Sequence, residues 1–306
     1  MKTLSFVIAV YRNKGALHLT YEGLKSLFDG PLKNYHYEFV FVDDGSDDGS
    51  LEELLSLREK DPRVRVISLS RNFGQIPAVI AGFRHTTGDA VINLSADLQE
   101  PVDAVVAMVQ EWEKGAEVVM GQRLSREDSL LANVLGNAYW RILHWTNPSL
   151  PRGSDFFLLG RQAADIFNGI EESDRFFPMD VLWLGFRPKI VPYHRQKRKI
   201  GTSQWKLSKK IKLAIDGILS STYFFIRFIS VSGILIGILG FIAAAIVAIQ
   251  RIVQGTQYPG WAAIVVLLLI LNGMVMFMLG IIGEYVWRIY NQAKGRSAYI
   301  VRRKYE

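Results

Sequence analysis

The chain has 306 residues, of which 49% are hydrophobic and 21% charged, a mixture that predicts a soluble part and a membrane-embedded part. It has no cysteine, which excludes disulfide-stapled secreted domains, thiolate zinc sites and cysteine nucleophiles. Residues 1–180 hold 18 Lys and Arg against 26 Asp and Glu, whereas residues 181–306 hold 18 against 3. This basic second half predicts an anionic partner, either nucleic acid or lipid.

The first 165 residues alternate short apolar runs with helical patterns. The runs predict strands at 4–10, 37–42, 64–69, 90–94 and 117–120. Helices are predicted at 16–28, 51–60, 75–84 and 102–114. Strands separated by helices of about 10–15 residues favour a mostly parallel sheet with crossover helices. Ligands of such sheets bind beyond the carboxyl ends of the strands.

An acidic loop follows the second predicted strand, where Asp43 and Asp44 precede a Gly-Ser turn. Carboxylates at a strand end are suited to accept hydrogen bonds from a nucleotide base and from ribose hydroxyls. An ordinary polar turn has the same composition, so the loop alone does not decide between the two interpretations. No Walker-type loop and no dinucleotide glycine fingerprint follows the first predicted strand, which removes support for those cofactor sites.

The fourth predicted strand leads into Ser95-Ala-Asp97-Leu-Gln99-Glu-Pro. Mg²⁺ binds one or two protein carboxylates and keeps waters and substrate phosphates as its other ligands. Asp97 fits this role, with Gln99 and Ser95 as weaker or water-mediated neighbours. The five histidines show no ligand spacing and are not assigned to a metal.

Two runs of 23 uncharged residues, 228–250 and 261–283, lie in the last third of the chain. A helix needs about 20 apolar residues to cross the hydrocarbon core, so both runs are predicted to span a membrane. Lys and Arg gather before the first run and after the second, which places both termini in the cytoplasm. The basic, partly apolar segment ahead of the first run predicts amphipathic helices in the headgroup region, and nucleic acid becomes the weaker alternative. The alternating tail 299–305 predicts a short strand able to pair with another protomer.

Several further motifs follow in a fixed order. The ordered set is Val-Asp43-Asp44-Gly-Ser-x-Asp, Ser70-Arg71-Asn72-Phe73-Gly74, x-Ala-Asp97-Leu-Gln99-x-Pro, Gly-Gln-Arg123, Gly153-Ser-Asp155-Phe-Phe-Leu-Leu and Arg198-Lys-Ile-Gly201-Thr-Ser203-x-Trp205. This set resembles the inverting GT-A glycosyltransferases of family 2. More narrowly, it resembles the branch that acts on polyprenyl phosphates, which includes dolichol-phosphate mannose synthases and bactoprenol glucosyltransferases.

The resemblance implies an α/β fold with four parts. A GT-A domain, Rossmann-like with a mostly parallel sheet, is expected over residues 1–195. Basic amphipathic juxtamembrane helices follow over 196–227, two transmembrane helices over 228–287 and a basic cytoplasmic tail over 288–306. The implied location is the bacterial cytoplasmic (inner) membrane, with the catalytic domain in the cytoplasm.

The resemblance also implies an activity. It is the inverting transfer of a hexose, with glucose favoured, from a UDP-sugar to undecaprenyl or another polyprenyl phosphate, with Mg²⁺ or Mn²⁺ as the cofactor. Nucleotide-sugar contacts fall on Asp43, Asp44, Ser46, Arg71, Gly74 and Asp97. The metal falls on Asp97, Gln99 and Ser95, and the acceptor phosphate on Arg123, Arg126, Arg198 and Ser203. Asp155 is implied as the catalytic base or as a group that orients the acceptor, and Asp97 is implied as catalytic through the metal-bound pyrophosphate.

Some alternatives stay open. Ser95 stands where the family usually has an acidic residue, which favours weaker metal binding or, from another class, a catalytically weak membrane scaffold. Galactose, N-acetylhexosamine or modified arabinose donors would leave similar motifs. A processive polysaccharide synthase would need a polymer channel, which two spans hardly form. A homo-oligomer, dimer or tetramer, is predicted from the tail strand and from glycines on the faces of the first span.

Overall fold

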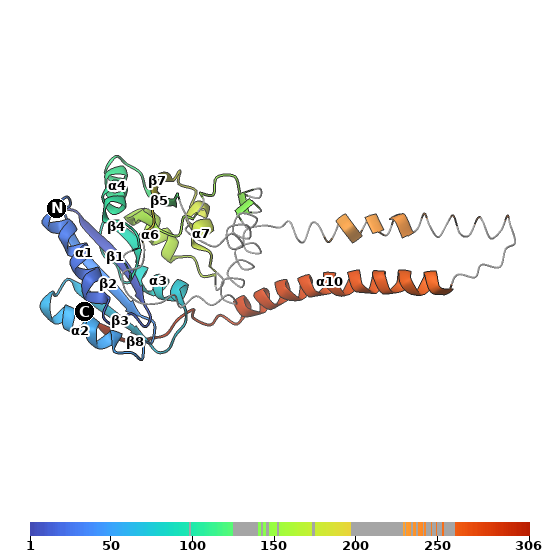
Figure 1. Cartoon of the computed structure of the whole chain (residues 1–306), viewed down its shortest axis with the longest axis horizontal. Helices are drawn as coiled ribbons and strands as arrows, with labels where there is room; N and C mark the ends of the chain where they lie inside the picture. Colours follow the sequence, from blue (N-terminus) through green and yellow to red (C-terminus); the bar gives the residue numbers. More distant parts are fainter. Residues whose placement is uncertain are drawn as a thin grey trace. The chain divides into compact units, whose positions relative to one another are not determined.

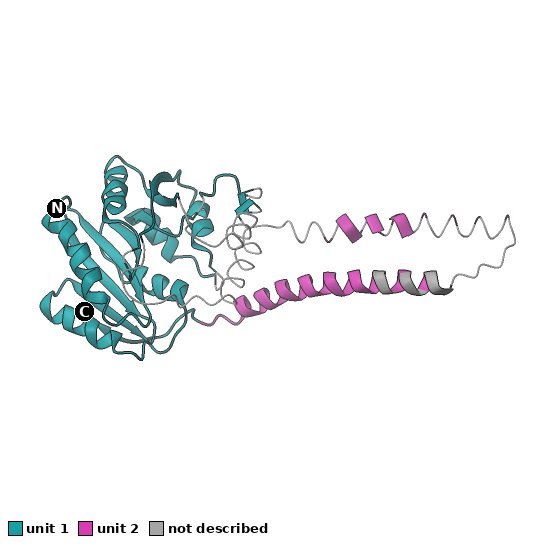
Figure 2. Cartoon of the chain, in the orientation of Figure 1, with its two compact units in different colours: residues 1–220, 297–306 teal, residues 221–296 magenta. Residues whose placement is uncertain are grey.

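The computed structural model describes residues 1–97, 99–124, 140–141, 143–144, 147–151, 153–172, 175–196 and 261–306, with scattered positions between 229 and 253. The chain divides into two compact units (Figure 2). The larger unit comprises Met1–Ser220 and Ser297–Glu306, and the smaller comprises Ser221–Arg296.

The larger unit begins with four strand–helix pairs (Figure 1). These are β1 (Thr3–Val10), α1 (Leu17–Asp29), β2 (His36–Asp43), α2 (Ser50–Lys60), β3 (Val64–Leu69), α3 (Gln75–Phe83), β4 (Ala90–Ser95) and α4 (Val102–Glu113). The described remainder of the unit holds β5 (Val118–Arg123), β6 (Phe157–Gly160), α6 (Arg161–Asn168), α7 (Phe177–Trp183), β7 (Lys189–Tyr193) and β8 (Val301–Tyr305). The strands and helices predicted over the first 120 residues are all confirmed, with ends that differ by about three residues or less.

All the described strands of this unit join one eight-stranded sheet in the order β7-β5-β6-β4-β1-β2-β3-β8. β1 to β4 are mutually parallel, and β5 is parallel to β7. β6 lies between β4 and β5 and is antiparallel to both, and β8 is antiparallel to β3. The predicted α/β architecture with a mostly parallel sheet is therefore confirmed.

Helices cover both faces of the sheet (Figure 1). On β1, Phe6 and Ile8 face a core formed with α1, α2 and α4, whereas Val7 between them faces a core formed with α3, α6 and α7. This alternation follows from the period of two in a strand, and a sheet covered on both faces needs apolar residues at both sets of positions. The near-continuous apolar runs in the sequence reflect this double coverage.

The tail strand is confirmed as β8, and its partner is β3 of the same chain. In the antiparallel register Ser68 lies opposite Arg303, and the N–H of Ser70 donates to the carbonyl of Ile300 at 2.9 Å. The pairing of this strand with another protomer stays a prediction, since β3 takes up only one edge of β8. β3 would otherwise be an edge strand with unpaired backbone groups, and β8 satisfies them.

The smaller unit contains α10 (Trp261–Ala293), a helix of 33 residues. Within the described ranges, no helix combines the length and the apolar character that a membrane crossing requires, so neither predicted span is identified in this part of the chain. The predicted span 228–250 falls mostly outside the described residues, and 261–283 falls on α10. Most of the predicted juxtamembrane helices, from residue 197 onward, also lie outside the described residues.

Candidate active site

Four strand ends meet at one edge of the sheet, because β1 to β4 run in parallel. In the β1–β2 register Val10 lies opposite Asp43. In the β1–β4 register Ala9 lies opposite Ser95. The loops that follow these strands therefore lie at the edge where open α/β sheets bind ligands. The acidic motifs after β2 and β4 come together there, as the sequence predicts.

Asp44 ties the end of β2 to the loop that follows β3. Its N–H donates to the carbonyl of Val10 at 2.8 Å. Its carboxylate accepts the backbone N–H groups of Phe73 at 2.7 Å and Gly74 at 2.9 Å. The residue is only 2% exposed, and a buried carboxylate needs such donors because it has lost its hydration. Asp44 therefore sets the shape of the loop that is predicted to hold the nucleotide.

Asp43 organises the turn in which it lies. Its carboxylate accepts the N–H of Ser46 at 3.0 Å and the hydroxyl of Ser68 at 3.2 Å. Gly45 has φ +68°, and a Cβ atom there would lie 2.5 Å from the carbonyl carbon of Arg71. Only glycine permits this close approach. The acidic turn and the loop after β3 are thus packed directly against each other.

Two guanidinium groups accompany these loops. Arg12 follows β1, donates to both carboxylate oxygens of Asp47 at 2.7 and 2.6 Å, and by these hydrogen bonds lowers the pKa of that carboxyl. The N–H of Arg12 also donates to the hydroxyl of Ser46 at 3.1 Å. Arg71 lies over the ring of Phe73, with 4.1 Å from Cζ to the ring centroid. Arginine binds phosphate oxygens well because its fork of donors stays charged.

The turn from β4 to α4 carries the predicted metal residues. Asp97 is 8% exposed, and the preceding carbonyl of Ala96 accepts the hydroxyl of Thr20 at 2.7 Å. Ser95 donates to the carboxylate of Glu100 twice, through its N–H at 3.1 Å and its hydroxyl at 2.9 Å. Glu100 is itself 7% exposed. The turn is thus held by a hydrogen bond from Thr20 of α1 and by the hydrogen bonds between its own residues Ser95 and Glu100.

Gln99 connects this turn to the segment after β7. Its side-chain oxygen accepts from Nη2 of Arg195 at 2.6 Å, and its side-chain nitrogen donates to the carbonyl of Gln196 at 3.2 Å. The N–H of Gln196 donates to the carbonyl of Gln99 at 2.9 Å. The oxygen of Gln99 that the sequence predicts as a metal ligand is therefore bonded to a guanidinium here.

These oxygen donors fit a hard divalent cation. Asp97 supplies a carboxylate, while the hydroxyl of Ser95 and the amide of Gln99 have the protein partners just described. No group of three or more His, Cys, Asp or Glu side chains in the described part of the chain forms a metal site. Mg²⁺ often takes one or two carboxylates and completes its shell with water and substrate phosphates. The residues suit a cation that binds together with a nucleotide.

Asp155 lies at the same edge, because β6 runs antiparallel to β4 and begins where β4 ends. Asn93 on β4 fixes the backbone there. Its side-chain nitrogen donates to the carbonyl of Asp155 at 2.8 Å, and its side-chain oxygen accepts the N–H of Phe157 at 2.8 Å. The side chain of Asp155 is exposed. A solvent-facing carboxylate on a fixed backbone is suited to meet a substrate.

Charges of both signs surround this carboxylate. Burial raises the pKa of Glu100, Asp155 raises it further, and Arg195 opposes the shift. Burial also raises the pKa of Tyr193, again with a contribution from Asp155 and with opposition from Arg123. Arg123 ends β5 and Arg195 follows β7. These two arginines therefore lie near the two carboxyl groups, those of Glu100 and Asp155.

Arg123 packs against the turn that leads to Asp155. Gly153 in that turn has φ +67°, and a Cβ atom there would lie 3.2 Å from Cβ of Arg123. Arg123, predicted near the acceptor phosphate, thus lies next to the segment that leads to Asp155, the residue predicted as base or orienting group. The other three predicted acceptor residues lie outside the described residues. They are Arg126, Arg198 and Ser203.

Three residues at this edge carry no assignment from the sequence. Asn93 is a single polar residue inside an apolar strand, and that contrast is its signal. Glu100 stands within the acidic motif itself, one residue after Gln99. Arg195 is one of many basic residues in its region, and nothing local indicates a partner 96 residues away.

The chain is similar to several known proteins. The model of glycosyl transferase family 2 matches residues 5–168. An uncharacterized glycosyltransferase of Bacillus subtilis, YkcC, is 35% identical over 304 residues, which cover 98% of this chain and 94% of that protein. A bactoprenol glucosyl transferase of Shigella phage SfX is 31% identical over 302 residues, with 98% of both chains covered.

The fold has a counterpart among solved structures. Mannosyl-3-phosphoglycerate synthase from Rubrobacter xylanophilus is similar with a TM-score of 0.51 and 17% identity, over 85% of this chain and 78% of that one. At this identity the likeness concerns the fold alone. Since the family model spans more than half of the chain and the relatives extend along nearly all of it, the chain belongs to glycosyl transferase family 2.

Proposed function

We propose that this chain transfers a hexose, with glucose favoured, from a UDP-sugar to a polyprenyl phosphate such as undecaprenyl phosphate. The transfer inverts the anomeric centre and takes place at the cytoplasmic face of the bacterial inner membrane. Relatives named bactoprenol glucosyl transferase, aligned along 98% of this chain, support the choice of acceptor and sugar.

One observation carries the proposal. The loops organised by Asp43 and Asp44, the turn of Asp97 and the carboxylate of Asp155 lie at a single edge of the sheet. A nucleotide, a cation with its diphosphate and an acceptor can therefore occupy neighbouring places. Arg71 and Arg123 add permanent positive charge at this edge, where a diphosphate leaving group develops negative charge.

The residues support a direct displacement. An oxygen of the acceptor phosphate forms the new bond to the anomeric carbon, while the bond from that carbon to the diphosphate oxygen breaks and its electron pair leaves with UDP. Asp97 would hold Mg²⁺ or Mn²⁺, and the cation would neutralise charge on the departing diphosphate. Because the attacking oxygen is already anionic, no proton has to be removed from it. Asp155 then serves to orient the acceptor.

The second half of the chain supports a membrane location. It contains the two uncharged runs of 23 residues, and no acidic residue stands between Asp180 and Asp216. Along α10, apolar side chains such as Leu267, Val275 and Phe277 are exposed. Basic residues beside apolar helices attract anionic lipid headgroups, which would bring the site to the phosphate of a lipid acceptor.

The proposal is tested with the full chain purified in detergent and mixed with undecaprenyl phosphate. Labelled UDP-glucose, UDP-galactose, UDP-N-acetylglucosamine and a UDP-linked modified arabinose are supplied separately, with Mg²⁺ or with a chelator. We expect label from one donor, UDP-glucose, in the organic phase, and we expect the chelator to abolish it. Transfer from another donor would correct the sugar.

A variant pair makes the test specific. Asp97→Ala is expected to lose metal-dependent transfer by about 100-fold or more while it keeps the far-UV spectrum of the wild type. Asp103→Asn removes the same charge from an exposed position in the first turn of α4 and is expected to retain transfer. If folded wild-type protein transfers no sugar from any donor, the proposal fails and the membrane scaffold is favoured.

A further inference from the structure

The tail of the chain continues past the end of the strand that it covers. β8 lies beside β3 at the edge of the sheet (Figure 1), and their pairing ends where Leu69 lies opposite Val301. One residue further, the carbonyl of Ile300 accepts the N–H of Ser70 at 2.9 Å. Ser70 begins the nucleotide loop (residues 70–74), which follows β3. The tail therefore extends beyond the paired strands to the start of this loop.

A bulge in β8 determines which face of the sheet the tail covers. The register shifts between Ser68 and Leu69, where Arg302 is an extra residue in β8. Because side chains alternate along a strand, an extra residue turns the remaining side chains to the other face. Tyr305 accordingly packs against the core formed with α1, α2 and α4, whereas Tyr299 lies in the core formed with α3, α6 and α7. The bulge thus brings Tyr299 to the face on which α3 follows the nucleotide loop.

The ring of Tyr299 holds the tail in place. Tyr299 is 8% exposed, and Arg84 at the end of α3 lies over its ring, with 5.9 Å from Cζ to the centroid. The hydroxyl of Ser297 donates to the carbonyl of Tyr299 at 2.6 Å. The side chain of Ile300, by contrast, is exposed. The buried ring of Tyr299 therefore keeps the neighbouring carbonyl of Ile300 at Ser70.

The nucleotide loop is held at its other end by Asp44. The carboxylate of Asp44 accepts the N–H groups of Phe73 and Gly74. Between the two ends lies Arg71, which is exposed. A loop that is fixed at both ends needs less ordering when a ligand binds, and this pre-organisation favours affinity.

Resting on the proposed function, we propose that Tyr299 is a positioning residue for the UDP part of the donor. Its ring holds the tail against Ser70, and the tail fixes the start of the nucleotide loop as Asp44 fixes its end. When one anchor is lost, the loop samples other conformations. The apparent affinity then falls in proportion to the fraction of molecules that keep the binding-competent conformation.

The test measures UDP binding. Isothermal titration of UDP with Mg²⁺ against the full chain in detergent compares the wild type with Tyr299→Ala, Tyr299→Phe and Tyr305→Ala. Tyr299→Ala is expected to weaken binding about 10-fold, as for a loop that is competent in about one molecule in ten. Tyr299→Phe keeps the ring and is expected to bind within about twofold of the wild type. Tyr305→Ala removes a ring from the same tail on the opposite face, and it is also expected to bind within about twofold.

Hydrogen exchange of the same proteins, followed by mass spectrometry, reports on the loop directly. In Tyr299→Ala we expect faster exchange in peptides that span residues 70–74, because the loop opens more often. Peptides from β1 and β2 are expected to keep the exchange rates of the wild type. This pattern separates a local effect on the loop from a loss of the whole fold.

The outcomes distinguish the two proposals. If the wild type binds UDP and Tyr299→Ala binds it equally well, the role of Tyr299 is overturned and the proposed function stands. An equal loss of affinity in Tyr305→Ala, or a loss in Tyr299→Phe as large as in Tyr299→Ala, also overturns it. The same holds if exchange in the loop is unchanged, or if it rises throughout the sheet. If the wild type binds no UDP, the proposed function itself fails.

Discussion

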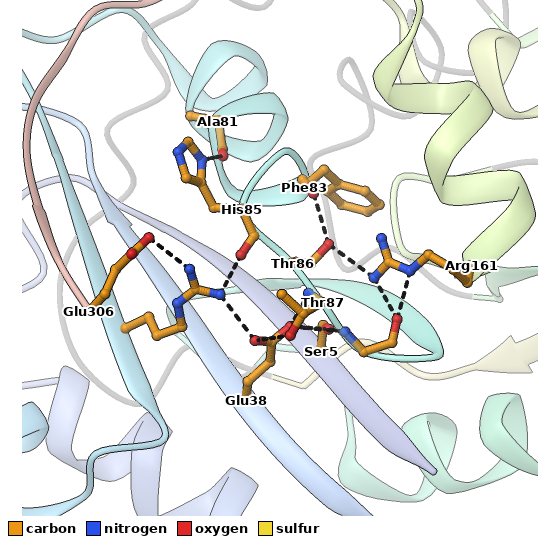
Figure 3. A network of polar contacts seen from close by, with 11 residues as sticks. Ser5, Glu38, Ala81, Phe83, His85, Thr86, Thr87, Arg161 and Glu306 are labelled. Carbon is orange, nitrogen blue, oxygen red and sulfur yellow. Dashed lines mark hydrogen bonds and ion pairs between the residues drawn. The ribbon is translucent and has the colours of Figure 1, made fainter.

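Arg65 on β3 forms an ion pair with Glu38 on β2, with 3.2 Å between Nη1 and Oε2, near the amino ends of these strands (Figure 3). Arg65 also donates to Glu306 at 2.8 Å and to the carbonyl of His85 at 2.6 Å. The other carboxylate oxygen of Glu38 accepts, among others, the N–H of Gly88 at 3.1 Å. One guanidinium therefore joins two central strands, the tail after β8 and the turn that precedes β4.

Arg65→Met is expected to lower the free energy of unfolding by about 2–3 kcal/mol. The change leaves the buried carboxylate of Glu38 without its ionic partner and releases the tail, while the methionine keeps much of the side-chain volume. Urea denaturation of the full chain, followed by tryptophan fluorescence, measures the change. Lys2→Met removes the exposed ion pair with Glu113 and is expected to cost less than about 1 kcal/mol. Equal losses in the two variants would contradict the role of Arg65.

Asp61 makes the free energy of unfolding of the larger unit depend on pH in the acid range. Burial raises the pKa of Asp61, but hydrogen bonds from Arg63, Tyr37 and Tyr21 outweigh burial and lower it to about 2, from 3.8. The two phenol hydroxyls donate at 2.7 and 3.0 Å. A lowered native pKa stabilises the fold above pH 3.8, and this stabilisation is lost as the pH falls through the native value.

Asp61→Asn is therefore expected to be less stable than the wild type at pH 6 by about 2 kcal/mol, the usual range for hydrogen bonds to a charged group. The difference in thermal midpoint between the two proteins should narrow as the pH falls from about 4 toward 2. Asp29→Asn, at the exposed end of α1, serves as the control for removal of a surface charge. A difference that stays constant with pH would show that the charge of Asp61 is not involved.

The strands and helices in the first half of the larger unit can be predicted from sequence, because local residue patterns determine them. β1 to β4 are apolar runs bounded by turn residues, and α1 to α4 have apolar residues at helical spacing. β6 and β7 are not predicted, because runs of four and five residues carry too little periodicity. The insertion of β6 between β4 and β5 depends on pairings across the chain, which no local pattern encodes.

The candidate site shows the same division. Asp43, Asp44 and Asp97 are predicted from sequence because each lies in a short motif after a predicted strand, whereas Asp155 is implied by the family resemblance. The partners that hold these loops are set by the tertiary fold, as the bond between Arg195 and the side chain of Gln99 shows. The sequence thus indicates which carboxylates are suited to bind ligands. It does not indicate that Asp44 also accepts hydrogen bonds from the backbone of Phe73 and Gly74, because the tertiary fold brings these groups together.

Asp44→Asn is expected to weaken UDP binding about 10-fold. The asparagine keeps one acceptor for the N–H groups of Phe73 and Gly74, while its amide nitrogen opposes the other, so the loop after β3 loses its bound shape. Isothermal titration of UDP against the full chain measures the change. Asp47→Asn removes a charge from the same acidic loop at an exposed ion pair and is expected to stay within about twofold of the wild type. Equal effects would point to general electrostatics instead of loop shape.

Asp155→Asn is expected to lower kcat by about 10–100-fold and to leave KM for the UDP-sugar nearly unchanged. The backbone at this position is held by Asn93, so the neutral isostere keeps its place while the carboxylate charge disappears. A phosphate monoester loses its second proton at a pH of about 6. A group that only orients the acceptor therefore loses the same factor at every pH, whereas a general base matters only where the acceptor still carries that proton. Single-turnover transfer measured from pH 6 to 9 separates the two, with Asp165→Asn on the exposed face of α6 as the matched control. A loss confined to the low end of this range, where the acceptor phosphate still carries a proton, would assign Asp155 as the base that removes it.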